Sequence, residues 1–372
     1  MNKIDRLLNS ANRMLRNCAS KPSSDWSYVS SGLLHNDPHV SKIFHGIISG
    51  ERAALAKGIT LVESLNSRKK AMGEALLAKL IRHQRDLEAA GKKYTFRIGL
   101  SGAPGAGKST MIESLGMKLT EEGHSVAVLT VDPSSVSTGG SILGDKTRMF
   151  KLSQNSKAFI RQSPSKCNLG GVTRNTNESI SLCEGAGYDV ILVETVGVGQ
   201  SEIAVSDMVD MFCMVVPPAA GDELQGLKKG IMEVADAVIV NKADGDLLPA
   251  ARRAQAEYTS ALKLMRKKSE LWTPQVLRVS SMTTEGMDKL WSLMSSYHQV
   301  MIDNGELSAK RERQKVVWMW NHAHDQLLDL FQSHPSVTRQ RSDLERQVLN
   351  GHLSPGFAAD LLLNDFFGSQ KK

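Results

Sequence analysis

The clearest chemical signal in the sequence is a run of eight residues, namely Gly102, Ala103, Pro104, Gly105, Ala106, Gly107, Lys108 and Ser109. The run has the Gly-x-x-x-x-Gly-Lys-Ser spacing of a phosphate loop. Its glycines allow a tight turn whose backbone N–H groups point at phosphate oxygens, and the helix that follows adds a favourable field. We therefore expect Lys108 to neutralise the outer phosphates, Ser109 to ligate Mg²⁺, and Thr110 to line the same nucleotide site.

A second motif, Asn241-Lys242-Ala-Asp244, directly follows an apolar run and would select the base of the nucleotide. A carboxylate at Asp244 can accept from both N1–H and the exocyclic amine of guanine, whereas adenine offers no such pair of donors. A polar site of this kind discriminates by roughly 10⁴ or more. We expect Asn241 to brace the loop and the Lys242 stem to lie along the base. A four-residue match is often a surface turn, but its place downstream of a phosphate loop favours a GTP/GDP site.

Three further residues, Ser280, Ser281 and Met282, follow the next predicted strand. They are placed to contact the guanine oxygen through backbone N–H groups, although Ser281 stands where a smaller residue is usual.

Carboxylates near predicted strand ends could complete the magnesium site, directly or through water. Asp132 follows the second strand, Asp145 follows a Gly-rich turn, and Glu194 ends the Ile191–Val193 run. Glu194 resembles the acid that precedes the γ-phosphate sensor of GTPases, where aspartate is usual. Asp145 could equally be a simple turn residue.

The segment after Glu194 predicts a slow switch. In many GTPases a glutamine directly after the switch glycine orients the attacking water. Here Val198 follows Gly197, and the nearest glutamine is Gln200. We therefore expect slow intrinsic hydrolysis that a partner or a loop rearrangement accelerates. Arg148 could stabilise transition-state charge, or could form a salt bridge to a neighbouring acid.

The elements that must position these residues alternate between short apolar runs and helical patterns. Alternation of this kind predicts an α/β fold with a mostly parallel sheet covered on both faces by helices, and with ligands at the C-terminal ends of the strands. The predicted strands are Phe96–Leu100, Ser125–Val131, Asp189–Val193, Met211–Val216, Ala237–Val240 and Gln275–Val279. We expect a transit or flexible segment at 1–37, a helical extension at 38–93, the phosphate-loop domain at 94–304 and C-terminal helices at 305–372.

The composition limits the possible partners. The net charge of +7 comes from basic residues that alternate with acids along the chain, so nucleic-acid binding is not favoured. The four cysteines show no paired metal spacing, and no apolar run approaches the roughly 20 residues of a membrane span. The first 24 residues bear Arg6, Arg13 and Arg16 among apolar residues, followed by a Ser-rich stretch. They fit either a transit peptide or an ordinary surface helix.

Together these residues resemble the MeaB/ArgK family of SIMIBI-class phosphate-loop GTPases, especially its mitochondrial members. The more specific stretches are Gly139–Met149 and Glu194–Glu202, and the similarity extends from about Gly46 to the end. The resemblance implies a GTPase chaperone of adenosylcobalamin-dependent methylmalonyl-CoA mutase that gates cofactor loading, protection and reactivation. Adenosylcobalamin would then be met only through the mutase.

The same resemblance implies three further properties. The first is a homodimer formed through the C-terminal helices, and the second is location in the mitochondrial matrix. The third is a loop over Gly221–Gly230, including Lys228 and Lys229, that couples nucleotide state to the mutase. Two other classes stay open: a phosphate-loop kinase, which a guanine-specific Asp244 argues against, and a metal-insertion GTPase, which usually carries Cys or His clusters.

Overall fold

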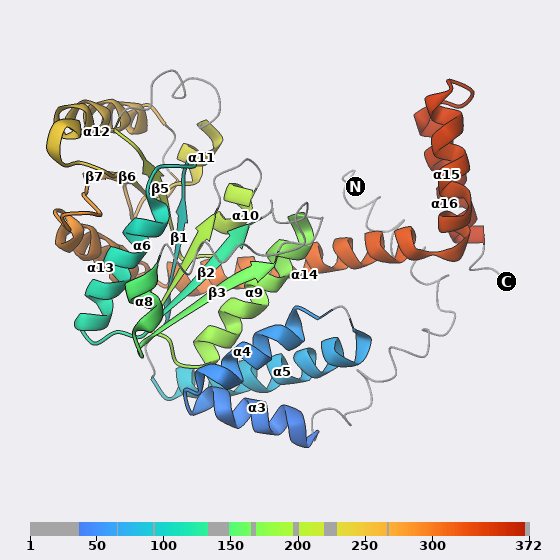
Figure 1. The fold of residues 1–372 in the computed structure, drawn as a ribbon, viewed down its shortest axis with the longest axis horizontal. Helices are drawn as coiled ribbons and strands as arrows, with labels where there is room; N and C mark the ends of the chain where they lie inside the picture. The colour runs from blue at the N-terminus through green and yellow to red at the C-terminus, as the bar shows by residue number, and fades with distance from the viewer. Residues whose placement is uncertain are drawn as a thin grey trace.

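The computed structural model describes residues 37–64, 66–91, 94–132, 149–164, 169–195, 201–218, 229–265 and 268–368. Within these ranges the centre of the molecule is a seven-stranded sheet in the order β3-β2-β4-β1-β5-β6-β7, with every neighbouring pair parallel (Figure 1). The strands are β1 (Phe96–Ser101), β2 (Val126–Asp132), β3 (Ala158–Pro164), β4 (Val190–Thr195), β5 (Met211–Val216), β6 (Ala237–Val240) and β7 (Gln275–Arg278). The predicted α/β class with a parallel sheet is confirmed.

Alternate residues of each central strand face two separate cores, so the strands read as continuous apolar runs. In β4, Ile191 and Val193 face one core while Val190 and Leu192 face the other. The first core is covered by α9 (Leu169–Gly185), α10 (Ser201–Ser206), α11 (Lys229–Val234) and α12 (Leu248–Lys263). The second is covered by α6 (Lys108–Glu121), α8 (Phe150–Gln154) and α13 (Met287–Asp303).

The edge strand β3 was not predicted from the sequence. Its residues Arg161, Gln162 and Ser163 interrupt any apolar run. Pairing with β2 in full register, from Val126 opposite Ala158 to Asp132 opposite Pro164, sets this segment as a strand despite its mixed composition. Tertiary pairing here overrides a weak local pattern.

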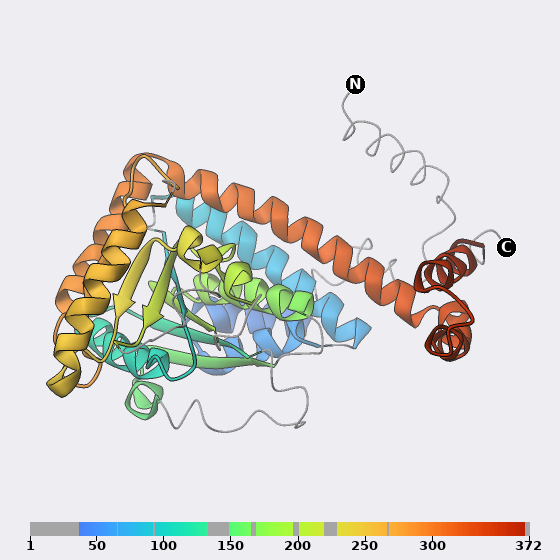
Figure 2. The same cartoon turned by 90° about the horizontal axis from the view of Figure 1, so that it is seen from above.

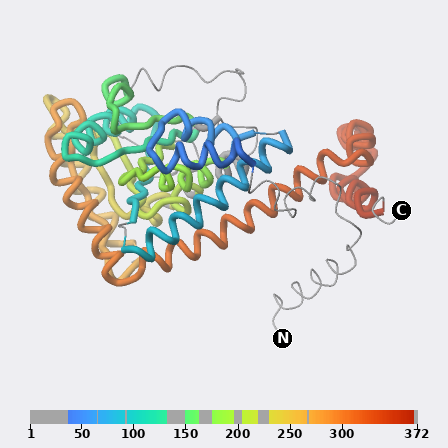
Figure 3. The backbone as a smooth tube through the Cα atoms, turned by 90° about the horizontal axis from the view of Figure 1, so that it is seen from below, coloured from blue at the N-terminus to red at the C-terminus, as the bar shows by residue number. Residues whose placement is uncertain are grey.

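Three N-terminal helices form a further layer outside α9: α3 (Pro38–Ile48), α4 (Arg52–Val62) and α5 (Ser67–Ala89) (Figure 3). Their apolar residues belong to the same core as α9. Helices α5 and α9 approach closely, because a Cβ at Gly185 would lie 2.8 Å from Leu80 Cδ2. Asp37 caps α3 by accepting from the backbone N–H of His39 at 2.7 Å.

The C-terminal helices leave the body of the molecule. The 28-residue α14 (Glu306–Ser333) packs its first turns on the core through Leu307, Arg311 and Gln314. It then projects away, and α15 (Pro335–Leu349) and α16 (Pro355–Gly368) pair at its far end (Figures 1 and 2). Among the described residues no helix is long and apolar enough to cross a membrane.

Candidate nucleotide site

The phosphate loop joins β1 to α6 at the C-terminal edge of the sheet, as the sequence predicted. Gly105 and Gly107 have φ of 82° and 87°, a backbone conformation that glycine adopts without a steric cost. Gly102 is needed for a different reason, since a Cβ there would lie 1.9 Å from the carbonyl oxygen of Val215. The loop therefore passes directly over the end of β5.

Lys108 lies inside this turn and is buried. Its ammonium donates to the carbonyl oxygens of Gly102 at 2.7 Å and of Ala103 at 3.2 Å. The loop thus holds a positive charge at its own centre, where a nucleotide's outer phosphates would have to lie. The role expected for Lys108 stays a prediction.

Ser109 and Glu194 meet across the sheet. Because β4 is the direct neighbour of β1, the carboxylate at the end of β4 comes within reach of the first turn of α6. The Ser109 hydroxyl donates to Glu194 Oε1 at 2.8 Å, and Glu194 is buried. That donation uses the hydroxyl proton and leaves the Ser109 oxygen lone pairs available to a cation. A hydroxyl oxygen beside a carboxylate is the hard-oxygen donor set that Mg²⁺ prefers, so these residues fit the ion.

Asp132 ends β2, next to β4, with Val131 opposite Thr195. Its backbone therefore reaches the same edge of the sheet as Glu194, while its side chain lies outside the described residues. Asp145, Arg148, Gly197, Gln200 and Lys228 also lie outside them, and Lys229 is described only as the first backbone residue of α11. Their expected roles stay predictions.

Asn241 connects the Asn241–Asp244 motif, which is predicted to select the base, to the phosphate loop. Its side-chain amide donates to the carbonyl oxygens of Ala106 at 3.0 Å and Gly107 at 3.2 Å. Its Oδ1 accepts from the backbone N–H of Ser281 at 3.2 Å and from the Ser281 hydroxyl at 2.7 Å. One buried amide thus contacts both the phosphate loop and the loop at Ser281.

Asp244 lies beside Ser280, whose hydroxyl donates to Asp244 Oδ2. Lys242 has a φ of 56°, so the motif turns sharply between Asn241 and Asp244. Ser280 N–H donates to Glu285 O at 2.9 Å, and Ser281 N–H donates to Asn241. Of the three residues whose backbone N–H groups were expected to contact the base, Ser280 and Ser281 thus donate within the protein, and Met282 beside them is 80% exposed.

A cavity of about 570 Å³ opens next to this loop, with Thr110, Ser281 and Met282 in its lining. Sequence reasoning missed one residue that shapes it. The Ser114 hydroxyl donates to Ser281 O at 2.6 Å and so fastens α6 to the loop. No motif marks Ser114, because its role depends on where a later loop passes over the helix.

The described residues contain no cluster of three or more His, Cys, Asp or Glu side chains that could hold a metal. Cys183 and Cys213 are buried free thiols in the two cores, and burial raises the pKa of both.

Comparison with known proteins agrees with this geometry. The family model of the methylmalonyl Co-A mutase-associated GTPase MeaB matches residues 55–336. The mitochondrial methylmalonic aciduria type A homolog of Mus musculus is 56% identical over 329 residues, which cover 88% of this chain and 79% of the relative. The GTPase ArgK of Escherichia coli is 42% identical over 320 residues, which cover 86% of this chain and 94% of the relative.

The solved structure of a LAO/AO transport system kinase matches with a TM-score of 0.68 and 35% identity, over 88% of this chain and 98% of that one. The matched family region begins within α4, contains the phosphate loop and the Asn241–Asp244 motif, and ends at the start of α15. The chain therefore belongs to the MeaB family of methylmalonyl-CoA mutase-associated GTPases.

Proposed function

We propose that this GTPase is a chaperone of methylmalonyl-CoA mutase, and that its nucleotide state gates the loading, protection and reactivation of the mutase's adenosylcobalamin. The observation that carries the nucleotide part is the Asn241 bridge, in which one amide contacts both the phosphate loop and the loop beside Asp244. The mutase partner is supported by membership of a family described as mutase-associated. The mouse relative is named for methylmalonic aciduria and for mitochondria, which supports action in the mitochondrial matrix.

In this proposal each residue of the site has one role. Lys108 holds the outer phosphates, the Ser109 oxygen faces the cation, and Glu194 keeps the Ser109 hydroxyl oriented through the 2.8 Å hydrogen bond. Mg²⁺, when bound, would neutralise charge on the phosphates. Asp244 selects guanine over adenine. Hydrolysis by the chain alone is slow, because Val198 rather than glutamine follows Gly197.

The C-terminal helices, outside the phosphate-loop domain, would form a dimer interface. The exposed apolar residues of α14 include Val316, Trp320, Leu327 and Leu330, between 54% and 62% exposed. They recur at helical spacing along one stripe, and a stripe of this length on a projecting helix fits a second copy of the same arm. We therefore propose a homodimer through the region 305–372.

The test is to mix the purified chain with methylmalonyl-CoA mutase and GTP, GDP or ATP, and to measure complex formation and phosphate release together. We expect a complex whose stability differs between GTP and GDP, and turnover that the mutase stimulates. ATP should give neither. If no complex forms with either guanine nucleotide while GTP is still hydrolysed, the chaperone proposal fails and the GTPase stands.

A kinase is the second candidate, and its only support is the 35% identity to the LAO/AO transport system kinase. The same experiment addresses it, because a kinase would transfer phosphate from the nucleotide to protein rather than to water. Radiolabelled γ-phosphate in the protein fraction would support the kinase.

A further inference from the structure

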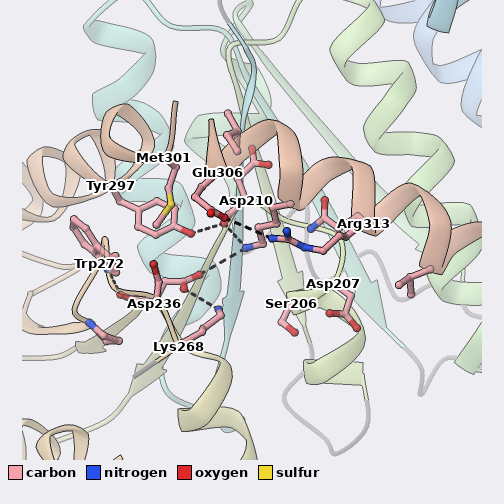
Figure 4. Close-up of a pocket in the computed structure, with 16 residues that line it drawn as sticks. Ser206, Asp207, Asp210, Asp236, Lys268, Trp272, Tyr297, Met301, Glu306 and Arg313 are labelled. Carbon is pink, nitrogen blue, oxygen red and sulfur yellow. Dashed lines mark hydrogen bonds and ion pairs between the residues drawn. The ribbon is translucent and has the colours of Figure 1, made fainter. Parts of the chain in front are cut away.

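A second cavity, of about 340 Å³, is lined by residues near the N-terminal ends of the parallel strands, and Figure 4 shows these lining residues. Asp210 and Asp236 line it, and they immediately precede β5 and β6. The nucleotide motifs follow the C-terminal ends of the strands, whereas this cavity lies at the N-terminal ends. It is therefore a separate site, lined by the end of α10, the segment 268–274 and helices α13 and α14.

The two deep carboxylates of this cavity are satisfied by the protein itself. Asp210 accepts from Arg311 Nε at 2.9 Å and from the backbone N–H of Arg97 at 2.9 Å. Asp236 accepts from Lys268 Nζ at 2.8 Å and from the backbone N–H of Phe212 at 2.9 Å. Neither carboxylate requires a ligand.

Two other charges in the lining are not matched in this way. Lys310 Nζ donates to the carbonyl oxygen of Asp210 at 2.5 Å. Its ion pair with a carboxylate, Asp236 Oδ2, is long, at 4.0 Å. An ammonium has three donors, so Lys310 retains hydrogen-bonding capacity toward the cavity. Within the described part of the chain, the Asp207 carboxylate forms no side-chain hydrogen bond or ion pair. Burial lowers the pKa of Lys310, and partial desolvation raises the pKa of Asp207, which is the more exposed of the two.

The remaining wall is apolar and held in place. Trp272 packs edge-on against Tyr297 with ring centroids 5.0 Å apart, and Trp272 Nε1 donates to Asp236 O at 2.9 Å. Tyr297 donates its hydroxyl to Asp210 O at 2.9 Å. Met301 and Leu307 complete this wall. In Figure 4 Trp272, Tyr297 and Met301 lie on one side of the cavity, and Ser206 and Asp207 lie on the other.

We propose that this cavity binds a free α-amino acid with an apolar side chain. Its carboxylate would pair with Lys310, its ammonium with Asp207, and its side chain would lie against Trp272 and Met301. A ligand with a single charge would pair with only one of Lys310 and Asp207, whereas a zwitterion matches both. The volume is within the range of small-molecule sites.

The test compares three ligands that share one apolar body: L-phenylalanine, 3-phenylpropionate and phenethylamine. Binding to the full chain with GDP present is measured by calorimetry and by ligand-observed NMR. We expect phenylalanine to bind at least about tenfold more tightly than either singly charged analogue, since each analogue loses one charged hydrogen bond. The proposal is overturned if phenylalanine, leucine and methionine all fail to bind at about 10 mM, or if the three analogues bind equally.

Two variants assign the contacts. Asp207→Asn should weaken phenylalanine about tenfold or more and leave 3-phenylpropionate unchanged, while Lys310→Met should weaken both acids. Lys315→Met, on the exposed surface of the same helix, is the matched control and should change neither. GDP affinity reports whether each variant is folded. Because Asp207 is exposed, we expect Asp207→Asn to fold even if Lys310→Met does not. Unchanged phenylalanine binding in Asp207→Asn would overturn the assignment of the ligand ammonium to Asp207.

Discussion

The side-chain amide of Asn241 approaches the backbone of Gly107 so closely that a Cβ on Gly107 would lie 2.5 Å from Asn241 Nδ2. The same amide donates to Gly107 O at 3.2 Å. Gly107, the last glycine of the phosphate loop, therefore serves two purposes. It adopts a φ of 87°, and its lack of a side chain leaves space for the Asn241 amide. We therefore predict that phosphate binding and base binding depend on each other through this contact.

Substitution of Asn241 tests that dependence. Asn241→Ala removes the donations to Ala106 and Gly107 and leaves the Ser281 hydroxyl without its acceptor. We expect affinity for both GDP and GTP to fall about tenfold or more, because each lost hydrogen bond contributes about 1 kcal/mol. Titration calorimetry with GDP measures the effect. Asn304→Ala, at the exposed end of α13, is the control, and equal affinities in the two variants would contradict the bridging role.

Base choice is expected to depend on Asp244. Asp244→Asn replaces two acceptor oxygens by one acceptor and one donor group, so the pair of guanine donors is no longer matched. Xanthine carries a carbonyl in place of the exocyclic amine, and the new amide can donate to it. We expect the preference to shift from GTP toward XTP, with loss of GTP affinity of about 10²-fold or more. Competition between the two nucleotides, measured on wild type and variant together, shows whether the preference moves. A variant that still prefers GTP would mean that another group selects the base.

The Ser109–Glu194 hydrogen bond makes a prediction about magnesium. Glu194→Gln keeps the size of the side chain but removes the charge that orients the Ser109 hydroxyl. We expect Mg²⁺-dependent GTP turnover to fall roughly 10- to 100-fold, as for other residues that orient a metal ligand. GDP affinity measured in EDTA should change little. A comparable loss of GDP affinity without the metal would instead assign Glu194 to the architecture of the loop.

Local sequence was sufficient for the parts of the site that follow directly from motifs. The strand before Gly102, the helix from Lys108 and the strand before Asn241 occur where the apolar runs predicted them. The contacts between these elements could not be predicted from local sequence. The Ser109–Glu194 contact joins residues 85 positions apart, and the Asn241–Gly107 contact joins residues 134 positions apart. These contacts depend on β1 having β4 and β5 as neighbours, which is a property of the strand order.

The roles of residues outside any motif could not be predicted from the sequence for the same reason. Ser114 gains its role only because the 280–282 loop passes over α6, and β3 becomes a strand only by pairing with β2. Arg97 and Arg311 looked like ordinary basic residues in the sequence. In the structure both are buried, at 5% and 8% exposure, because Glu184 and Asp210 lie opposite them.

This buried ion network fastens α14 to the core. Burial would raise the pKa of Asp210, but the charges and hydrogen bonds of Arg311 and Arg97 lower it to about 2. Arg311→Met leaves a buried carboxylate without its main partner, and we expect the free energy of unfolding to fall by about 3–5 kcal/mol. Urea denaturation measures this change. Arg313→Met on the same helix removes a side chain that is 67% exposed, so it should change stability by less than about 1 kcal/mol. Equal effects of the two substitutions would mean that the network does not anchor the helix.

The projecting part of α14 leads to the prediction about assembly. Trp320 is 62% exposed at the centre of a stripe that includes Val316 and Leu327. If two arms pack together, Trp320→Glu would place a charge in their apolar interface, which is costly because the charge loses its water without gaining a partner. We expect wild type to be a dimer by light scattering after size exclusion, and Trp320→Glu to be a monomer at about 10 µM. Lys315→Glu adds an acid five residues before Trp320, on the exposed surface of the same helix, and should remain dimeric. GTP turnover by the isolated monomer should persist, since the phosphate loop and the Asn241 bridge lie wholly within one chain. A monomeric wild type, or a dimer that Trp320→Glu leaves intact, would refute this interface.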